Sequence, residues 1–286
     1  MNHIKIMEKL PDRRKACYGL LGAVIILPAV ILVLVIYVYP FLQSFISSFQ
    51  SHGSFSFENY KYVSEVYAYD VFYTIVISAI SLLCVMLIGI FIGGYLIISE
   101  NKVLEFLFKI PLFIPFVVVG HAIRTFLAPK GILNSLLGQI GLVNMESPPD
   151  FIYGFTGTVI ALTWKQMAFA LLLIMGAFES VDKSYLEAAR NFGASGFKQI
   201  KDILLPLSWG SIGVSAVLIY TSFLQNFSVV MMMGKGDGPQ HLMIDIYHRI
   251  NYLNDYGVAN ALGVISYILA MGAAIIYLRK VLKNDG

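Results

Sequence analysis

The chain has 286 residues, of which 58% are hydrophobic and only 13% are charged, and its mean hydropathy is +0.75. This composition lies outside the usual range of soluble globular proteins and is typical of a membrane protein. The formal net charge of +3 is too small to indicate a nucleic-acid partner. Cys17 and Cys84 stand beside or within apolar segments without the spacing of a redox pair or a zinc site, so we predict no disulfide and no metal centre.

Six apolar stretches are long enough to cross a bilayer as helices, which takes about 20 residues because backbone groups in lipid must bond within their own segment. The predicted spans cover residues 19–40, 72–98, 107–127, 156–178, 209–232 and 258–279. The first apolar stretch is too long for a cleaved signal peptide, so we predict an uncleaved span after an N-terminal segment, residues 1–18. We therefore expect an all-α membrane protein, a polytopic bundle of six transmembrane helices in one membrane domain over 19–282.

Lysine and arginine set the predicted orientation, because the cytoplasmic loops of membrane proteins carry an excess of them. With the N terminus inside, the outer loops hold few of the 20 basic residues, namely Lys61, Lys130, Lys235 and Arg249. We therefore expect both termini to be cytoplasmic. Segment 180–207 then forms a cytoplasmic loop between the fourth and fifth spans.

Local signals predict two short helices in loop 180–207. Ser184 followed by Glu187 fits a capping box, which predicts that the first helix begins at Ser184. Gly193 stands where a left-handed C-terminal cap would end this helix. A second helix is predicted to begin at Ser195, and Pro206 is expected to end it because a proline disfavours helical geometry at the preceding residue.

Both predicted helices are too short to be stable alone. One interpretation is a solvated connector that packs against its own bundle. The other is a helix-turn-helix knob in which Ala188 and Ala189 allow the close approach of a separate cytoplasmic protein. The residues by themselves leave both interpretations open.

The stretch "EAARNFGASGFKQIKDILLP" resembles the EAA loop of the membrane subunits of binding-protein-dependent ATP-binding cassette importers. The pattern of that loop is EAA, three residues, glycine, a variable stretch and an apolar Leu-Pro ending. The matching positions are Glu187, Ala188, Ala189, Gly193, Ile203, Leu205 and Pro206. The stretches "FSFENYKYV", "IPLFIP" and "GILNSLLGQIGL" resemble the sugar and polyamine branch of the same superfamily, so the resemblance covers residues 55–282. Asn191 and Phe192 stand where many sugar permeases carry Ile-Asp, which leaves the solute class open.

The resemblance implies a permease subunit of the bacterial cytoplasmic (inner) membrane. Two such chains, identical or paralogous, form the pathway for a sugar or polyamine-like solute in the lipid bilayer. An ATPase dimer binds from the cytoplasm, and an extracytoplasmic solute-binding protein delivers the solute. Loop 180–207 then carries the coupling helix, and the implied coupling residues are Ser184, Glu187, Ala188, Ala189, Gly193 and Pro206.

The chain itself is not expected to be an enzyme or to hold a cofactor. Its nearest approach to a phosphate-binding GxxxxGK[ST] loop, "MMMGKGDG", lacks the first glycine and the Ser or Thr. Two alternatives are a secondary transporter and an intramembrane enzyme. A secondary transporter would more often show a coupling carboxylate or helices interrupted at the midplane, and an enzyme would need a nucleophile and a base. The predicted spans hold no Asp or Glu well inside them.

Three polar residues inside the predicted spans are candidates for the solute path. Lys165 lies in the fourth span, where a central lysine costs about 3 kcal/mol, so it either extends toward the outer surface or contacts the solute. Gln225 and Asn226 fall near the middle of the fifth span. Buried amides at that depth either bond between helices or line the path.

Overall fold

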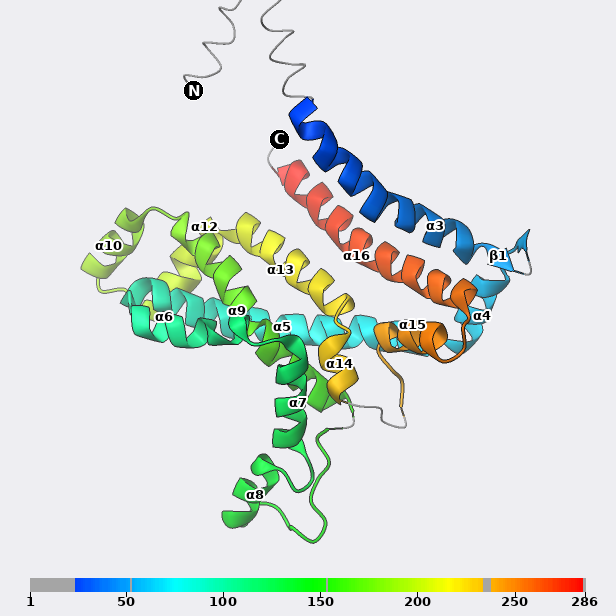
Figure 1. The fold of residues 1–286 in the computed structure, drawn as a ribbon. Coiled ribbons are helices and arrows are strands. Elements are labelled where there is room, and N and C mark those ends of the chain that lie inside the picture. The colour runs from blue at the N-terminus through cyan, green and yellow to red at the C-terminus, as the bar shows by residue number, and fades with distance from the viewer. Residues whose placement is uncertain (1–23, 52, 153, 234–237, 285–286) are drawn as a thin grey trace, which may run out of the picture.

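The computed structural model describes residues 24–51, 53–152, 154–233 and 238–284, which fold almost entirely into helices (Figure 1). Five of the described helices are long and apolar enough to cross a membrane, and a sharply bent pair would make a sixth. The predicted all-α membrane bundle is therefore confirmed. The predicted N-terminal segment, the start of the first span and Lys235 lie outside the described residues.

Two long helices, α5 (Ala68–Ser99) and α9 (Phe155–Glu179), form the centre of the bundle and cover the predicted second and fourth spans. Gly89 of α5 lies against Ile174 of α9, and a Cβ atom at Gly89 would lie only 2.8 Å from the Ile174 Cδ1 atom. Small residues let membrane helices approach closely, and the van der Waals packing that this approach permits holds the helices together. Half of the most apolar stretch of α9 is buried, the largest share among the candidate spans in the described residues. Helix α9 is therefore the most buried of these candidate spans, and its neighbours pack around it.

The first and last membrane helices lie side by side at one edge of the bundle (Figure 1). Helix α16 (Tyr256–Asn284) covers the predicted sixth span and packs against α3 (Tyr39–Ser48), the final part of the first helix. The Ser44 hydroxyl donates a hydrogen bond of 2.7 Å to the Asn260 side-chain oxygen across this contact. The most apolar stretch of the first helix has no buried residue, so that surface is available to lipid or to another chain.

Pro40 lies inside a helix, and Pro206 is followed by one further helical residue. The first membrane helix covers Val24–Ser48 and continues past Pro40, so its predicted end at residue 40 is wrong. Helix α12 (Leu205–Leu207) contains Pro206, and Leu205 has helical φ and ψ angles of −64° and −47°, so the prediction that Pro206 ends the helix is also wrong. A π-helical turn precedes each proline: η1 (Leu34–Val38) and η3 (Ile200–Leu204). A π-turn already departs from the i→i−4 pattern, so the missing N–H of proline interrupts fewer helical bonds there.

The predicted third span, 107–127, is not one continuous helix. The predicted span falls in three elements, which are the end of α6 (Lys102–Lys109), the 3₁₀ turn η2 (Ile110–Phe113) and α7 (Phe116–Leu127). Helix α8 (Ile132–Gln139) follows. Pro115 lacks the N–H that an α-helix would donate to the Pro111 carbonyl, and Ile114 is extended with ψ of 126°. The membrane-length unit is the stretch from α7 to α8, which projects away from α5 (Figure 1).

The predicted fifth span, 209–232, is also interrupted. Helix α13 (Trp209–Leu224) ends before Gln225, and helix α14 (Ser228–Met233) begins three residues later. On its other side, α13 meets the preceding helical segment, Gly196–Leu207, at an angle of 83°. The predicted span runs through the break at Gln225 and Asn226, because the apolar residues on either side outweigh these two polar residues.

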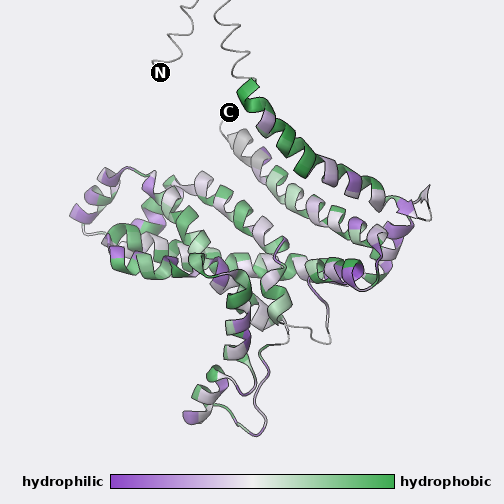
Figure 2. Ribbon diagram, in the orientation of Figure 1, coloured by the Kyte–Doolittle hydropathy of each residue, from purple (hydrophilic) through white to green (hydrophobic). Residues whose placement is uncertain are grey.

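Two of the predicted outer loops, those that hold Lys61 and Arg249, fold into short elements at the N-terminal end of α5 (Figure 1). These elements are β1 (Gln50–Ser51), antiparallel β2 (Ser54–Phe55), α4 (Glu58–Val66) and α15 (Leu242–Asn251). Val63, Leu242 and Leu262 form a small buried core that joins α4, α15 and α16. Figure 2 shows hydrophilic residues gathered over α4 at this end and over α10 (Lys183–Asn191) at the other.

Candidate functional site

Helix α10 (Lys183–Asn191) lies in the predicted coupling loop, and its N-cap is Asp182 rather than Ser184. The Asp182 carboxylate accepts a hydrogen bond of 2.9 Å from the Ser184 backbone N–H, which holds the pKa of Asp182 below its ordinary value. Ser184 is therefore inside the first turn, Glu187 stays exposed, and the predicted capping box is wrong. Aspartate caps a helix as well as serine does, so the local pattern contained two candidates two residues apart.

Gly193 ends α10 in the left-handed conformation that its position predicts, with φ of +75°. The Gly193 N–H donates to the Arg190 carbonyl at 2.9 Å, and the Ala194 N–H donates to the Ala189 carbonyl at 3.0 Å. These two bonds form a Schellman motif, which satisfies carbonyl groups that the end of a helix leaves open. The motif fixes the direction in which the chain leaves α10.

The helix that follows is anchored in the bundle. Helix α11 (Gly196–Gln199) begins after Ser195, as predicted, and continues into η3. Ile200 is 6% exposed and Leu204 is fully buried. Ile200 lies against Gly94 of α5, where a Cβ atom would lie only 2.6 Å from the Ile200 Cγ1 atom. The loop is therefore packed directly against α5 at this position.

Helix α10 itself exposes an apolar face. Tyr185, Ala188, Ala189 and Phe192 have i, i+3, i+4, i+7 spacing, which places them on one face of the helix. Tyr185 is 56% exposed and Phe192 is 92% exposed, whereas Leu186 is the buried residue of α10. The helix projects from the bundle (Figure 1), with two small residues between two exposed rings. An exposed apolar face on a projecting helix favours docking over the solvated-connector interpretation.

An ion pair connects the start of α10 to the end of α5. The Lys183 ammonium lies 2.8 Å from the Glu100 carboxylate, and this hydrogen bond lowers the pKa of Glu100 and raises that of Lys183. Both side chains are exposed, so the pair contributes little to stability. It does limit the orientations that α10 can adopt relative to α5.

Lys165, the first candidate for the solute path, binds the interruption in the third span. It is 4% exposed, and its ammonium donates to the carbonyl oxygens of Pro111 at 2.8 Å and Ile114 at 2.5 Å. The same nitrogen lies 4.4 Å from the centre of the Phe116 ring. The side chain does not extend toward the membrane surface, so that interpretation is wrong. The Lys165 ammonium already binds two carbonyl groups. Its contact with the solute stays a prediction.

Gln225 and Asn226 lie in the break between α13 and α14 rather than inside a helix. Asn226 is 6% exposed, and its side-chain oxygen accepts a hydrogen bond of 3.2 Å from the Val229 backbone N–H, which caps α14. Gln225 is exposed and ends α13. Asn226 therefore makes a local cap rather than the predicted hydrogen bond between helices. That Gln225 or Asn226 lines the solute path stays a prediction.

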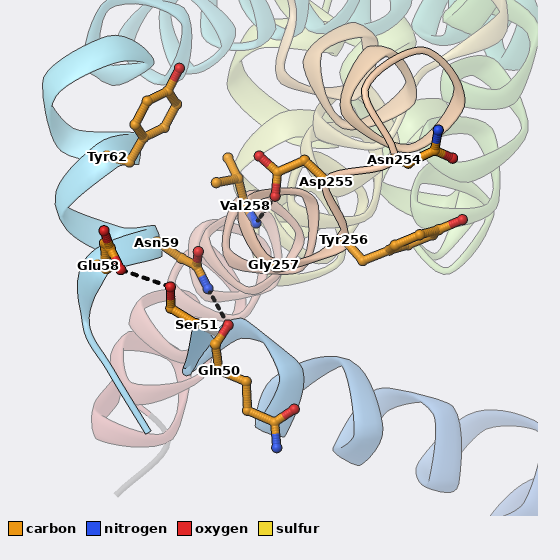
Figure 3. A pocket seen from close by; sticks show the side chains of 10 residues that line it. All are labelled: Gln50, Ser51, Glu58, Asn59, Tyr62, Asn254, Asp255, Tyr256, Gly257 and Val258. Atoms are coloured by element: carbon orange, nitrogen blue, oxygen red, sulfur yellow. Dashed lines mark hydrogen bonds between the residues drawn. The ribbon is translucent and has the colours of Figure 1, made fainter. Parts of the chain in front are cut away.

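A polar pocket of about 420 Å³ lies between the β-hairpin, α4 and the turn before α16 (Figure 3). Glu58 of α4 and Asp255 of the turn stand on opposite sides of it. Arg249 fixes one wall: its guanidinium donates to the hydroxyls of Tyr62 and Tyr67, both at 2.7 Å, and to the Asp255 carboxylate at 2.9 Å. Arg249 lies in a predicted outer loop, but this network is not visible in the sequence, because its members come from distant segments.

Comparison with known proteins agrees with this architecture. Residues 85–282 match the family described as binding-protein-dependent transport system inner membrane component. The chain is 28% identical to the trehalose/maltose transport system permease protein MalF of Thermococcus litoralis, over 95% of this chain and 97% of that protein. It is 26% identical to the sulfoquinovosyl glycerol permease protein SmoG of Agrobacterium fabrum, over 93% and 92% of the two chains.

A shorter match and a solved structure extend the comparison. The spermidine/putrescine permease protein PotB of Escherichia coli is 25% identical over 70% of this chain and 72% of that protein. A chain of a bacterial alginate ABC transporter, crystallised with an alginate-bound periplasmic protein, has the same fold. The TM-score is 0.77 at 21% identity, covering 92% of this chain and 94% of that one.

The bundle of membrane helices with a projecting, glycine-terminated helix before the last crossings defines a membrane subunit of a transport system. The chain belongs to the family of binding-protein-dependent transport system inner membrane components, and it is a permease subunit of the ABC importer type. Interrupted helices were expected of a secondary transporter, yet two predicted spans are interrupted within the described residues, so that feature does not separate the two classes of transporter. The family match does separate them.

Proposed function

We propose that this chain is one of two permease subunits that together form the path for a sugar or sugar derivative across a bacterial cytoplasmic membrane. Two relatives that match over more than nine tenths of the chain carry saccharide names, trehalose/maltose and sulfoquinovosyl glycerol. A polyamine-like solute is the second candidate, because a spermidine/putrescine permease matches over 70% of the chain. The partner permease is an identical or a paralogous chain.

The exposed face of α10 carries this proposal. An ATPase dimer in the cytoplasm binds Tyr185, Ala188, Ala189 and Phe192, and ATP is hydrolysed on that separate subunit rather than on this chain. Both termini and the coupling loop are cytoplasmic, in keeping with the distribution of basic residues. Because α11 and η3 are anchored against α5 at Gly94, closure of the ATPase dimer moves α5 together with α10.

A solute-binding protein delivers the solute from the extracytoplasmic side. Support comes from the alginate transporter, whose structure was solved with a periplasmic protein. The short elements β1, β2, α4 and α15 face that side in the proposed orientation. They form the surface on which the binding protein docks.

The test is retention of the ATPase on the purified permease. Ala188→Trp places a large ring in the centre of the proposed interface, where one unfavourable residue costs about 2 kcal/mol, or about 30-fold in affinity. Lys198→Trp adds the same ring to the exposed surface of the next helix and serves as the control. We expect Ala188→Trp to lose the ATPase and Lys198→Trp to retain it. Full retention by Ala188→Trp would contradict the proposed interface.

ATP-dependent solute uptake tests the whole proposal. The permease pair, the ATPase and the solute-binding protein are reconstituted together in proteoliposomes. Uptake of a saccharide that requires both ATP and the binding protein is the expected result. Uptake that continues without the ATPase would indicate a secondary transporter instead.

A further inference from the structure

Two neighbouring side chains of α9 make hydrogen bonds to the two interrupted spans. Lys165 and Gln166 are consecutive residues of α9 and are 4% and 2% exposed. Lys165 binds the break before α7, whereas the Gln166 side-chain amide donates a hydrogen bond of 2.5 Å to the Ser222 hydroxyl of α13. Ser222 lies one turn before the break at Gln225. Consecutive side chains of a helix point about 100° apart, so a single turn of α9 reaches both neighbouring spans.

Lys165 supplies a hydrogen-bond donor that a proline removes. In a continuous α-helix the N–H of residue 115 would donate to the Pro111 carbonyl, but Pro115 has no N–H. The Pro111 carbonyl instead accepts from the Ile114 N–H at 3.3 Å and from the Lys165 ammonium at 2.8 Å. A charged donor makes the stronger bond, and positive charge is favoured at the carbonyl end of a helical segment. The break and the lysine therefore stabilise each other.

The helices beyond the two breaks pack closely against each other. Helix α7 follows the first break and α14 follows the second. A Cβ atom at Gly120 of α7 would lie 2.7 Å from the Met232 Cβ atom of α14 and 3.2 Å from the Val229 carbonyl oxygen. The Arg124 guanidinium also donates to the Met232 carbonyl at 3.4 Å. The two segments therefore form a pair, which we call the α7–α14 pair.

We propose that Lys165 and Gln166 are positioning residues of the transport cycle, which hold the two breaks against α9 while the α7–α14 pair turns about them to open and close the solute path. Interrupted helices bend at their breaks, and a few residues at the ends of elements absorb the change in backbone angles. The inference rests on the proposed function, because movement of the α7–α14 pair can open a path only if the chain lines one for the solute. Lys165 acts here through the helix that it holds rather than by touching the solute.

Four variants of α9 test the positioning role in proteoliposomes that contain the permeases, the ATPase and the binding protein. Lys165→Met and Gln166→Leu keep the side-chain length but remove the donors, and Lys165→Arg keeps the charge. Thr163→Val is the matched control, because Thr163 is 8% exposed on the same helix and its hydroxyl has no hydrogen-bond partner among the described residues. Solute uptake and ATP hydrolysis are measured on the same vesicles over a range of solute concentrations.

We expect Lys165→Met and Gln166→Leu to lower the maximal uptake rate by about tenfold, the loss typical of a removed buried bond to a charged or polar partner, with an unchanged KM. More ATP should be hydrolysed per solute, because the ATPase still cycles while the path opens less often. Thr163→Val should match the wild type, and Lys165→Arg should recover most of the uptake. Wild-type behaviour of Lys165→Met, or a change confined to KM, would overturn the positioning role.

Failure of the inference is distinguishable from failure of the proposed function. If the wild-type assembly shows no ATP-dependent uptake, the proposed function itself fails. If the wild type transports and Lys165→Met transports equally well, only the inference fails. If Lys165→Met does not assemble with the ATPase, the positioning role is tested by Gln166→Leu and by the cross-linking experiment described next.

A cross-link tests whether the α7–α14 pair moves as one body. Arg124→Cys and Met232→Cys are introduced together after Cys17 and Cys84 have been replaced by serine, and a short bifunctional thiol reagent joins the two new cysteines. The same double variant without the reagent is the control. Uptake by the cross-linked protein should equal that of the control, because the reagent joins two segments that turn together. Abolished uptake in a cross-linked assembly that still binds the ATPase would overturn the joint movement.

Discussion

Replacing Gly94 with alanine is expected to separate the coupling loop from α5. A Cβ atom at Gly94 would lie 2.6, 2.8 and 3.1 Å from the Cγ1, Cδ1 and Cγ2 atoms of Ile200. Non-bonded carbon atoms pack at about 3.5 to 4.0 Å, so the loop must move outward by about 1 Å or Ile200 must leave its buried position. Overpacking of this kind costs about 1 to 3 kcal/mol in stability. The displacement also weakens the contact through which α10 and α5 move together.

The compensating change is Ile200→Ala, which removes all three of the contacting atoms. Alone it leaves a cavity, because Ile200 is 6% exposed, and such a loss costs about 2 to 5 kcal/mol. In the double variant the new methyl group occupies part of that cavity. The double variant should therefore be at least about 1 kcal/mol more stable than the sum of the two single effects predicts.

The assays are the thermal unfolding midpoint of the purified permease and the amount of ATPase that it retains. Gly176→Ala is the matched control on α9, since nothing lies within 4 Å of a Cβ atom at that position. It should be neutral or slightly stabilising, because alanine favours the helix over glycine by about 0.5 to 1 kcal/mol. Strictly additive effects of Gly94→Ala and Ile200→Ala would refute the close-contact argument.

Three further predictions concern the coupling turn and the outer elements. Gly193→Val should destabilise α10 by about 1 to 2 kcal/mol and release the ATPase. Gly193→Asn should retain most of the ATPase, because asparagine tolerates the left-handed conformation. Equal retention of the ATPase by both variants would contradict this reasoning. Burial lowers the pKa of His241 from its ordinary 6.5 to about 4, so the unfolded chain binds a proton first and stability falls as the pH decreases from 6.5 toward 4. The loss reaches roughly 3 kcal/mol, and His241→Asn, which keeps the cap on the Met243 N–H without titrating, should show a flatter dependence of the unfolding midpoint on pH. Arg249→Met leaves Asp255 without its cation and should cost about 3 kcal/mol or more, while an unchanged unfolding midpoint would show that the network is not structural.

Much of the coupling loop could be predicted because its signals are local. The conformation of Gly193 follows from a helix that must end within a few residues, and the start of the second helix follows from Ser195. The capping box at Ser184 was wrong for the same local reason: Asp182 is an equally good cap two residues earlier. Local rules identify the turn but do not choose between neighbouring caps of similar strength.

The interruptions could not be predicted from apolar composition. The residues around Pro111 and Pro115 are mostly apolar, and apolar residues also flank Gln225 and Asn226 on both sides. The prolines gave a signal at a spacing of four residues, but Pro40 lies inside a continuous helix and the residue before Pro206 is also helical. Whether a proline breaks a helix depends on what receives the freed carbonyl groups, and that partner comes from elsewhere in the chain.

The sequence by itself determined that this chain is a membrane protein, that six apolar stretches are long enough to cross a bilayer, and that a helix in the loop before the last two ends at a glycine. These properties follow from composition, from segment length and from residues a few positions apart. Only the tertiary structure decided the place of Lys165, because its partners Pro111 and Ile114 lie more than fifty residues away in the chain. A buried ammonium is stable wherever donors and acceptors meet in three dimensions, and hydropathy does not record where that happens.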